Sequence, residues 1–301
     1  MQRLGCDSLG ADSGDSRPVL GILLTIAAMV ALASADAVAK HLTATYAIVQ
    51  ILWIRYVLYA GYGVYAAYAD AGTAGFRSRD MALQVARASL LAISNIVVVY
   101  AFSQLPLAHV HAVIAVAPLI VTGACVMFLG EHVEFRRWLA ICAGFVGIVI
   151  ILRPGADVFD LVSLSPLAGA LLYATYQVLT KLVTRNDGAG TTQFFTGLIG
   201  LLWFSIAVPF VWQDPAAGDW WWLCAAAILG TMAHVLIVLG LHLAPASTVQ
   251  PFNYSMLVAA TVLGYIFFDE IPDGATMSGA AVIVTAGLYV IHRERRALAA
   301  A

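Results

Sequence analysis

Charged side chains are scarce in this sequence. Only 11% of its 301 residues are Asp, Glu, Lys or Arg, whereas 62% are hydrophobic. A soluble domain carries about 25% charged residues, so this composition excludes a chain that folds entirely in water. Most side chains must therefore face lipid or one another. The formal net charge of -2 adds little, and no nucleic-acid partner is expected.

Motifs for metals, phosphates and covalent catalysis are also missing. The four cysteines have no metal-ligand spacing, so neither a structural disulfide nor a zinc site is expected. No His-Glu-x-x-His set, Ser-His-Asp arrangement or phosphate-binding loop occurs, which excludes ATP-driven transport within this chain. No catalytic residue, metal or cofactor is predicted. An intramembrane enzyme would need acids, bases or metal ligands that converge at one depth, and only dispersed neutral polar groups are found.

Long apolar runs, separated by short polar breaks, make up most of the chain. A helix of about 20 residues crosses the hydrocarbon core, and the runs lack the strict alternation of barrel strands. The sequence therefore predicts an all-α polytopic membrane protein that begins with a disordered tail over residues 1–17. Ten transmembrane helices are expected, over residues 19–42, 46–69, 81–103, 107–129, 136–152, 163–185, 191–212, 219–243, 246–268 and 275–292.

The distribution of Lys and Arg predicts the orientation in the membrane. With a cytoplasmic N-terminus, eleven Lys and Arg residues lie in cytoplasmic parts, and only Lys40 and Arg153 lie on the opposite side. Cytoplasmic loops of membrane proteins carry an excess of these residues. We therefore expect a multi-pass protein of the inner membrane with both termini in the cytoplasm.

The chain repeats itself at about half its length. The interval from Pro106 to Pro245 is the same as the interval from Glu131 to Glu270. A fixed internal spacing indicates two copies of one unit. Each copy has five spans, an odd number, so the second copy enters the membrane inverted, as in many secondary transporters. The expected units are a first five-helix repeat over residues 18–153, a second repeat over residues 163–296 and a tail over residues 297–301.

Two motifs resemble a known family. Phe128-Leu129-Gly130-Glu131 precedes the glycine-rich run 143–150, and Phe267-Phe268-Asp269-Glu270 precedes a second such run at 286–290, with Asp269 in place of the usual Gly. With Arg55 in the second span, they resemble the drug/metabolite transporter superfamily and its EamA-type repeats over residues 18–296. The resemblance implies ten helices around a central cavity and export of a small metabolite. Bacterial amino-acid exporters, including the aromatic-amino-acid exporter, are nearest.

Ionisable side chains inside the spans need a reason, because each costs about 2.5–3.5 kcal/mol at a helix centre. Asp36 and Lys40 are four residues apart and can pair on one helix face; the alternative is that Asp36 couples transport to protons. Arg55 is expected either to pair with Asp36 or to bind a substrate carboxylate, and the structural role is favoured. In the second repeat, Gln177 matches Asp36 and Leu198 stands opposite Arg55.

Other residues are assigned structural roles. Arg87 lies near the start of the third span, where its guanidinium is expected to reach the membrane interface. Glu131 and Glu270 end the fourth and ninth spans, and each is expected to cap the helix that follows it. Kinks are expected at three prolines that lie inside or near helix starts: Pro118, Pro209 and Pro251.

Neutral polar residues are the better candidates for a substrate site. The interval between the two prolines of the repeat also relates Asn95 to His234 and His111 to Gln250. The candidate substrate-binding residues are Asn95, Tyr100, His111, Tyr173, Tyr176, Gln177, His234, Gln250, Asn253 and Tyr254. Such a ring offers hydrogen-bond donors, acceptors and aromatic faces that attract cations, which suits a zwitterion. For each single residue, the alternative that it merely ties helices together stays open.

These patterns predict a secondary transporter, monomeric or weakly dimeric, that exports amino acids or similar small metabolites by alternating access. Either facilitated diffusion or proton coupling would drive it. The alternative is uptake or exchange of another metabolite or drug, and an intramembrane enzyme is less favoured. The expected partners are the small-molecule substrate and membrane lipid.

Overall fold

The regular structure of the described chain is helical throughout. The computed structural model describes residues 18–129, 135–153, 161–244 and 246–299. The α-helices are α1 Pro18–Leu42, α2 Ile48–Ala71, α3 Met81–Gln104, α4 Leu107–Ile114, α5 Ala117–Leu129, α6 Phe135–Leu152, α7 Ser165–Val183, α8 Ala189–Ala207, α9 Asp219–Leu243, α10 Ala246–Val249, α11 Ser255–Phe268 and α12 Gly274–Ala299. Short 3-10 turns are η2 Gly72–Phe76, η3 Leu161–Leu164, η4 Val208–Phe210 and η5 Gln250–Tyr254.

Helix lengths and compositions fit a membrane. Six segments in the described chain are long and apolar enough to cross one: Pro18–Leu42, Met81–Gln104, Val162–Val183, Ala189–Phe210, Asp219–Leu241 and Pro251–Phe268. Three shorter apolar segments accompany them, Leu107–Val121, Trp138–Leu152 and Gly274–Val290. The predicted all-α architecture of ten spanning segments is confirmed, because α4 with α5 forms one span and α10 with η5 and α11 forms another.

The fourth and ninth spans are both interrupted. The first helix of the fourth span ends at Ile114, before α5 begins at Ala117, and the ninth span passes through η5 before α11. The breaks lie at equivalent places, since the interval that joins Pro106 to Pro245 also joins Ala115 to Tyr254. Pro118 and Pro251 stand in the first turns after α4 and α10, where a residue without an amide proton is tolerated. Helix interruptions thus lie next to two of the three prolines at which kinks are predicted.

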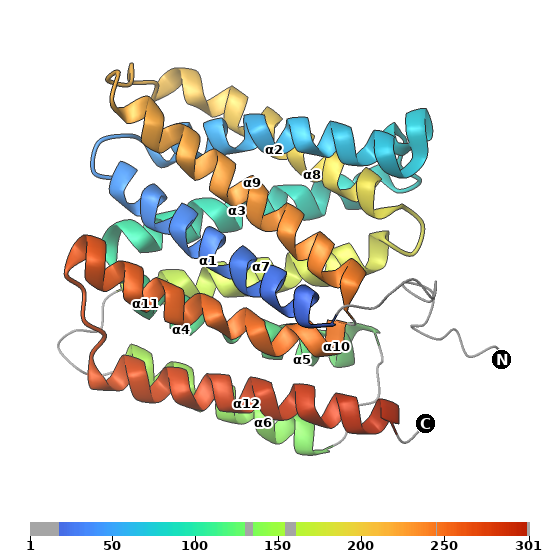
Figure 1. Ribbon diagram of the computed structural model, residues 1–301, viewed down its shortest axis with the longest axis vertical. Helices are drawn as coiled ribbons and strands as arrows, with labels where there is room; N and C mark the ends of the chain where they lie inside the picture. Colours follow the sequence, from blue (N-terminus) through green and yellow to red (C-terminus); the bar gives the residue numbers. More distant parts are fainter. Residues whose placement is uncertain (1–17, 130–134, 154–160, 245, 300–301) are drawn as a thin grey trace.

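Helices of opposite repeats pack in pairs. α1 packs against α9, α2 against α8, α3 against α7 and α6 against α12. Figure 1 shows α6 and α12 side by side along one edge of the bundle, with α2 and α8 near the opposite edge. α1 begins and α12 ends at the same end of the bundle, on the right of Figure 1. The interface between the repeats therefore runs through the whole molecule.

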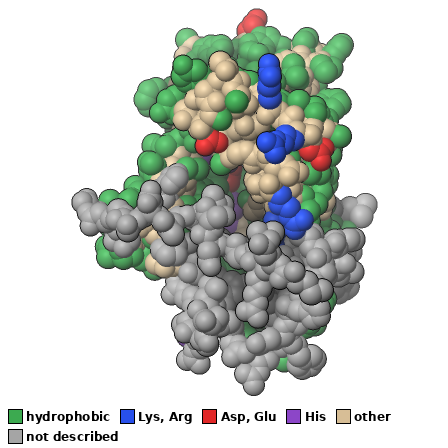
Figure 2. Space-filling view, turned by 90° about the vertical axis from the view of Figure 1, so that its right-hand side faces the viewer, with side chains coloured by type: hydrophobic (Ala, Val, Ile, Leu, Met, Phe, Trp, Pro, Cys, Tyr) green, Lys and Arg blue, Asp and Glu red, His purple; other side chains and the backbone are tan. Residues whose placement is uncertain are grey.

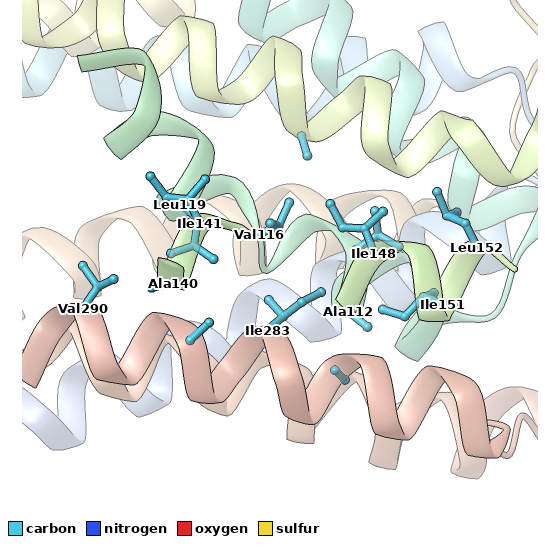
Figure 3. Packing of buried hydrophobic residues seen from close by; sticks show 14 residues of the cluster. Ala112, Val116, Leu119, Ala140, Ile141, Ile148, Ile151, Leu152, Ile283 and Val290 are labelled. Carbon is cyan, nitrogen blue, oxygen red and sulfur yellow. The ribbon is translucent and has the colours of Figure 1, made fainter. Parts of the chain in front are cut away.

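The last helices of the two repeats meet through small residues. Gly147 of α6 and Gly279 of α12 face each other so closely that a Cβ at either position would lie within 2.8 Å of the other's carbonyl oxygen. Around them, Ile148 and Ile151 pack with Ile283 (Figure 3). Because lipid is as apolar as these side chains, close packing rather than water exclusion drives such contacts.

Polar contacts between the repeats close both ends of the bundle. At one end, the Tyr46 hydroxyl donates to Asp219 Oδ2 (2.6 Å). At the other end, Ser78 donates to Asp187, which also accepts from the Arg79 amide (2.9 Å). The second of these ends is the one where α1 begins. Figure 2 shows it with Lys and Arg grouped in a polar area surrounded by hydrophobic side chains.

Candidate functional site

Lys40 does not pair with Asp36. Its Nζ pairs with Glu270 Oε1, donates to the Leu105 carbonyl (2.7 Å) and lies 5.2 Å from the centre of the Phe268 ring. Glu270 Oε2 accepts a hydrogen bond from the Leu107 amide (2.9 Å), the first residue of α4. Glu270 therefore caps α4 of the other repeat, and the prediction that it caps the following helix is wrong. Glu131 lies outside the described residues.

We name this contact the Lys40–Glu270 clamp, and a local turn positions it. Asp269 ends α11 in the left-handed conformation (φ 55°), and the Glu270 amide donates back to the Gly264 carbonyl (3.0 Å). This conformation favours Gly but is tolerated by Asp, which explains how Asp269 stands where the family has Gly. A pocket of about 600 Å³ adjoins the clamp and is lined partly by Lys40 and Phe268.

A buried carboxylate lies one helical turn before the clamp. Asp36 Oδ1 is 3.8 Å from Arg55 Nη1, and Oδ2 is 3.7 Å from His111 Nε2. Both distances exceed that of a hydrogen bond, and His111 Nε2 is buried without a partner. Three helices of the first repeat, α1, α2 and α4, bring these groups together. Of the two predictions for Arg55, the structure places it beside Asp36.

Aromatic side chains surround the next layer of the bundle. The Tyr56 hydroxyl accepts from Asn95 Nδ2 (2.9 Å), and the Tyr56 and Tyr59 rings are 5.9 Å apart. His234 of α9 lies 5.1 Å from the Tyr59 ring, and its Nδ1 is 2.9 Å from the Gly230 carbonyl. The Arg55 guanidinium fills the space above Gly230, where a Cβ would lie 3.2 Å from Nη2. Asn95 and His234 thus belong to one cluster.

α7 completes this aromatic cluster. The Tyr173 and Tyr176 rings are 5.8 Å apart, and Gln177 Nε2 donates to the Tyr173 hydroxyl (3.3 Å). Tyr176 is close enough to Tyr56 and to Tyr59 to interact electrostatically with both. Asn95 of α3, the three candidates of α7 and His234 of α9 therefore converge from both repeats. Sequence reasoning missed Tyr56 and Tyr59, although Tyr56 directly follows Arg55 and Tyr59 lies one helical turn after it.

Arg87 is not at the membrane interface. Its side chain is fully buried, and its Nη2 donates to Thr196 Oγ1 (2.8 Å) and to the Thr192 carbonyl. The guanidinium also lies 5.7 Å from the Tyr176 ring. The predicted interfacial position is wrong because neutral oxygen atoms on α8 satisfy the charge inside the protein. Arg87 consequently makes a cation–π contact with Tyr176 from inside the protein.

Several predicted residues lie apart from this cluster. Tyr100 is 41% exposed, and Asn253 is also exposed. Tyr254 instead fills the space above Gly287 of α12. The side chain of Gln250 lies outside the described part of the structure.

The arrangement of two inverted repeats around a polar centre agrees with one family model. The model of the EamA-like transporter family matches residues 19–153 and 162–292. This chain belongs to the EamA-like transporter family. As a member, it is a multi-pass membrane protein of a transporter family and not an enzyme.

Relatives of this EamA-like chain carry several substrates in their names. A riboflavin transporter of Vibrio cholerae is 32% identical, over 62% of this chain and 62% of that protein. An S-adenosylmethionine uptake transporter of Rickettsia bellii is 28% identical, over 66% and 68%. A pseudopaline exporter of Pseudomonas aeruginosa is 22% identical, over 91% and 97%. These relatives support a transporter of small metabolites and give no specific support to an amino-acid exporter.

A solved structure shares the fold of this EamA-like chain. One crystal structure aligns with a TM-score of 0.62 at 19% identity, covering 92% of this chain and 98% of its own. At this identity the likeness shows the fold alone. The roles of individual site residues therefore have to come from the geometry described above.

Proposed function

We propose that this protein takes up a metabolite in which a planar heteroaromatic ring is joined to a hydroxylated chain or sugar. The observation that carries the proposal is the cluster of aromatic rings in the middle of the bundle. Its members are Tyr56, Tyr59, Tyr173, Tyr176 and His234. Riboflavin and S-adenosylmethionine, named in two relatives, share this chemistry.

The cluster suits such a ring because its members offer flat faces with polar tips. Stacked or edge-on aromatic pairs contribute about 0.5–1.5 kcal/mol each beyond area burial, so a ring held between two tyrosines gains more than an aliphatic substrate. Asn95 and Gln177 each already bond a tyrosine hydroxyl. They orient the rings and keep amide groups available for ring nitrogens or hydroxyls.

Alternating access between the inverted repeats would carry the substrate across, in a monomer or weak dimer. We place both termini in the cytoplasm of an inner-membrane protein. The support is the group of exposed basic residues where α1 begins: Arg77, Arg79, Lys181 and Arg185. A basic face is expected on the cytoplasmic side. The Lys40–Glu270 clamp would then face the periplasm.

Export of amino acids or similar metabolites is the second candidate. It is favoured by one observation, that the pseudopaline exporter matches 91% of this chain. A zwitterion could also use the amides of the aromatic cluster together with Arg55. The two candidates differ in both substrate and direction, so one experiment separates them.

The test is transport by the purified protein in liposomes, with labelled riboflavin, S-adenosylmethionine and tryptophan. We expect saturable uptake of riboflavin or S-adenosylmethionine, reduced at least tenfold by Tyr176→Ala. Tyr265→Ala is the matched control, because Tyr265 is 57% exposed on α11, and it should leave uptake unchanged. Outward tryptophan flux alone would favour the second candidate, and no flux of any compound would overturn both.

A further inference from the structure

We propose that Asp36 is the proton-binding site that couples transport to a proton gradient. The proposal rests on the proposed transport function and adds the driving ion. It has three supports: the isolation of Asp36 among the acids, the open geometry of its neighbours, and the absence of an equivalent acid in the second repeat.

Asp36 is unusual among the acids of the described chain. Only two of them are buried, Asp36 and Asp187, and Asp187 lies in the loop between α7 and α8. Asp36 is therefore the single buried acid within a helix of the described residues. A carboxylate inside the membrane is expensive, and such residues commonly mark a pathway for a substrate, an ion or a proton.

The neighbours of Asp36 leave room for a proton. Arg55 and His111 stand 3.8 and 3.7 Å from its two oxygen atoms, so Asp36 accepts no hydrogen bond from the described residues. A purely structural ion pair in a low-dielectric interior would close to hydrogen-bond distance, because direct bonds offset the cost of burial. Here both oxygen atoms remain free to bind a proton while Arg55 stays near enough to stabilise the ionised form.

The two repeats differ at this place. Gln177 matches Asp36 in the second repeat, and Leu198 stands opposite Arg55. Contacts between the repeats, in contrast, occur at matching positions at both ends of the bundle: Tyr46 with Asp219, and Ser78 with Asp187. The second repeat forms the same fold with a neutral residue at the matching position. The fold therefore does not require a buried acid there, and Asp36 is free to serve another role.

Asp36 also lies beside an interrupted span. His111 lies in α4, one turn before the break at Ala115. His111 also lies one turn after Leu107, whose amide donates to Glu270 of the Lys40–Glu270 clamp. When a proton from the open side binds an Asp36 oxygen, the charge is neutralised and its attraction to Arg55 is lost. Release of that O–H proton to the other side restores the attraction.

Other titratable groups lie on the elements that pack against α1, and the test must allow for them. The elements packed against α1 carry Arg87 and Tyr100 (α3), His234 (α9), Tyr254 (η5) and Glu270 (after α11), while Lys40 and His41 lie on α1 itself. Arg55 and His111 join them from α2 and α4. Among the described residues, only Arg55 and His111 bring a basic nitrogen atom within 4 Å of the Asp36 carboxylate.

The experiment compares two readouts in liposomes into which the purified protein has been reconstituted. Uphill accumulation of labelled riboflavin, or of whichever compound the wild type transports, is driven by a pH difference of one unit. That difference supports up to about tenfold accumulation of a neutral substrate carried with one proton. Counterflow, the exchange of labelled for unlabelled substrate, needs no proton gradient. We expect Asp36→Asn to abolish accumulation while counterflow persists.

Controls separate this result from trivial ones. Asp214→Asn changes an exposed loop acid and should leave both readouts unchanged. Asp36→Glu keeps an ionisable group and should keep accumulation with a displaced pH profile. If Asp36→Asn fails to fold, Asp36→Glu alone provides the test. An unchanged pH profile of accumulation in Asp36→Glu would then count against the proposal. Undiminished accumulation by Asp36→Asn would overturn it. Absence of counterflow in the wild type would instead refute the proposed function.

Discussion

The two repeats are alike at their ends and different in their middles. The interval from Tyr46 to Asp187 is the same as the interval from Ser78 to Asp219. The hydroxyl–carboxylate bond at one end of the bundle thus has its counterpart at the other, and at both ends the first repeat supplies the hydroxyl donor and the second repeat the carboxylate acceptor. In the middle, the same interval leads from Asp36 of the first repeat to a neutral residue of the second, Gln177.

This difference separates architecture from chemistry. Contacts that close the ends are needed twice in an inverted pair, once on each face of the membrane, so their positions are kept while the residues change. A site for a substrate or a proton is needed once, and each repeat is free to contribute different groups to it. Symmetric positions are therefore expected to affect stability, and asymmetric ones transport.

The largest expected effect concerns the Lys40–Glu270 clamp. Glu270→Gln leaves the mostly buried Lys40 ammonium without its counter-charge, and loss of one partner from such a pair costs about 3–5 kcal/mol. Thermal unfolding in detergent should show a large drop in stability. The control is Asp273→Asn, which breaks the exposed pair with Arg153 and should cost at most about 1 kcal/mol. Equal losses in the two variants would contradict the importance of burial here.

A symmetric pair gives the next effect. Gly147→Ala and Gly279→Ala each place a methyl group against the other helix, and overpacking of this kind costs about 1–3 kcal/mol. Because the two contacts mirror each other, the two losses should agree. Gly61→Ala, where a Cβ meets nothing within 4 Å, should cause no loss. Unequal losses at 147 and 279, measured by thermal unfolding, would show that α6 and α12 do not share the contact evenly.

The bonds at the bundle ends should be weaker and matched. Tyr46→Phe removes the donor to Asp219, and Ser78→Ala removes the donor to Asp187. Each should lower the free energy of unfolding by about 1 kcal/mol, as for a typical intramolecular hydrogen bond. Both variants should retain full transport in the liposome assay. If either variant lost transport without losing stability, the bond at that end of the bundle would have a role in transport rather than in stability.

The smallest effect is a pH dependence at one end. Burial raises the pKa of Asp187, but hydrogen bonds from the Arg79 amide, Ser78 and Gln84 outweigh it and hold the pKa below its ordinary value. The stabilisation is therefore complete above about pH 4, the ordinary pKa of Asp, and is lost as the pH falls through the lower folded value. The test compares the unfolding temperatures of Asp187→Asn and the wild type at pH 6 and at pH 3. The difference between the two proteins should be smaller at pH 3 than at pH 6.

Local patterns predicted the helices better than the partners of their side chains. The first span was expected from residue 19 to 42 and extends over Pro18–Leu42, because apolar length alone determines it. The repeat spacing also brought Asn95 and His234 into one cluster. Glu270, however, binds Lys40 across 230 residues, and no spacing within one helix indicates that choice.

Arg87 illustrates the second limit. A lone arginine near a helix start is expected at the interface, since burial of a charge is expensive. The oxygen atoms of Thr192 and Thr196 that satisfy it lie far along the chain, on α8. Because these partners are ordinary threonines, their role becomes visible only when α3 and α8 are placed side by side.

The cap on α4 also sets an order of events during synthesis. Leu107 and its acceptor Glu270 are 163 residues apart, and ribosomes add about 5–20 residues per second. The cap from Glu270 to the first amide of α4 therefore forms only after the ninth span has been synthesised, roughly 10–30 s after Leu107. A nascent chain arrested before residue 270 should accordingly be open to membrane proteases at Leu107, and become protected when synthesis passes that point.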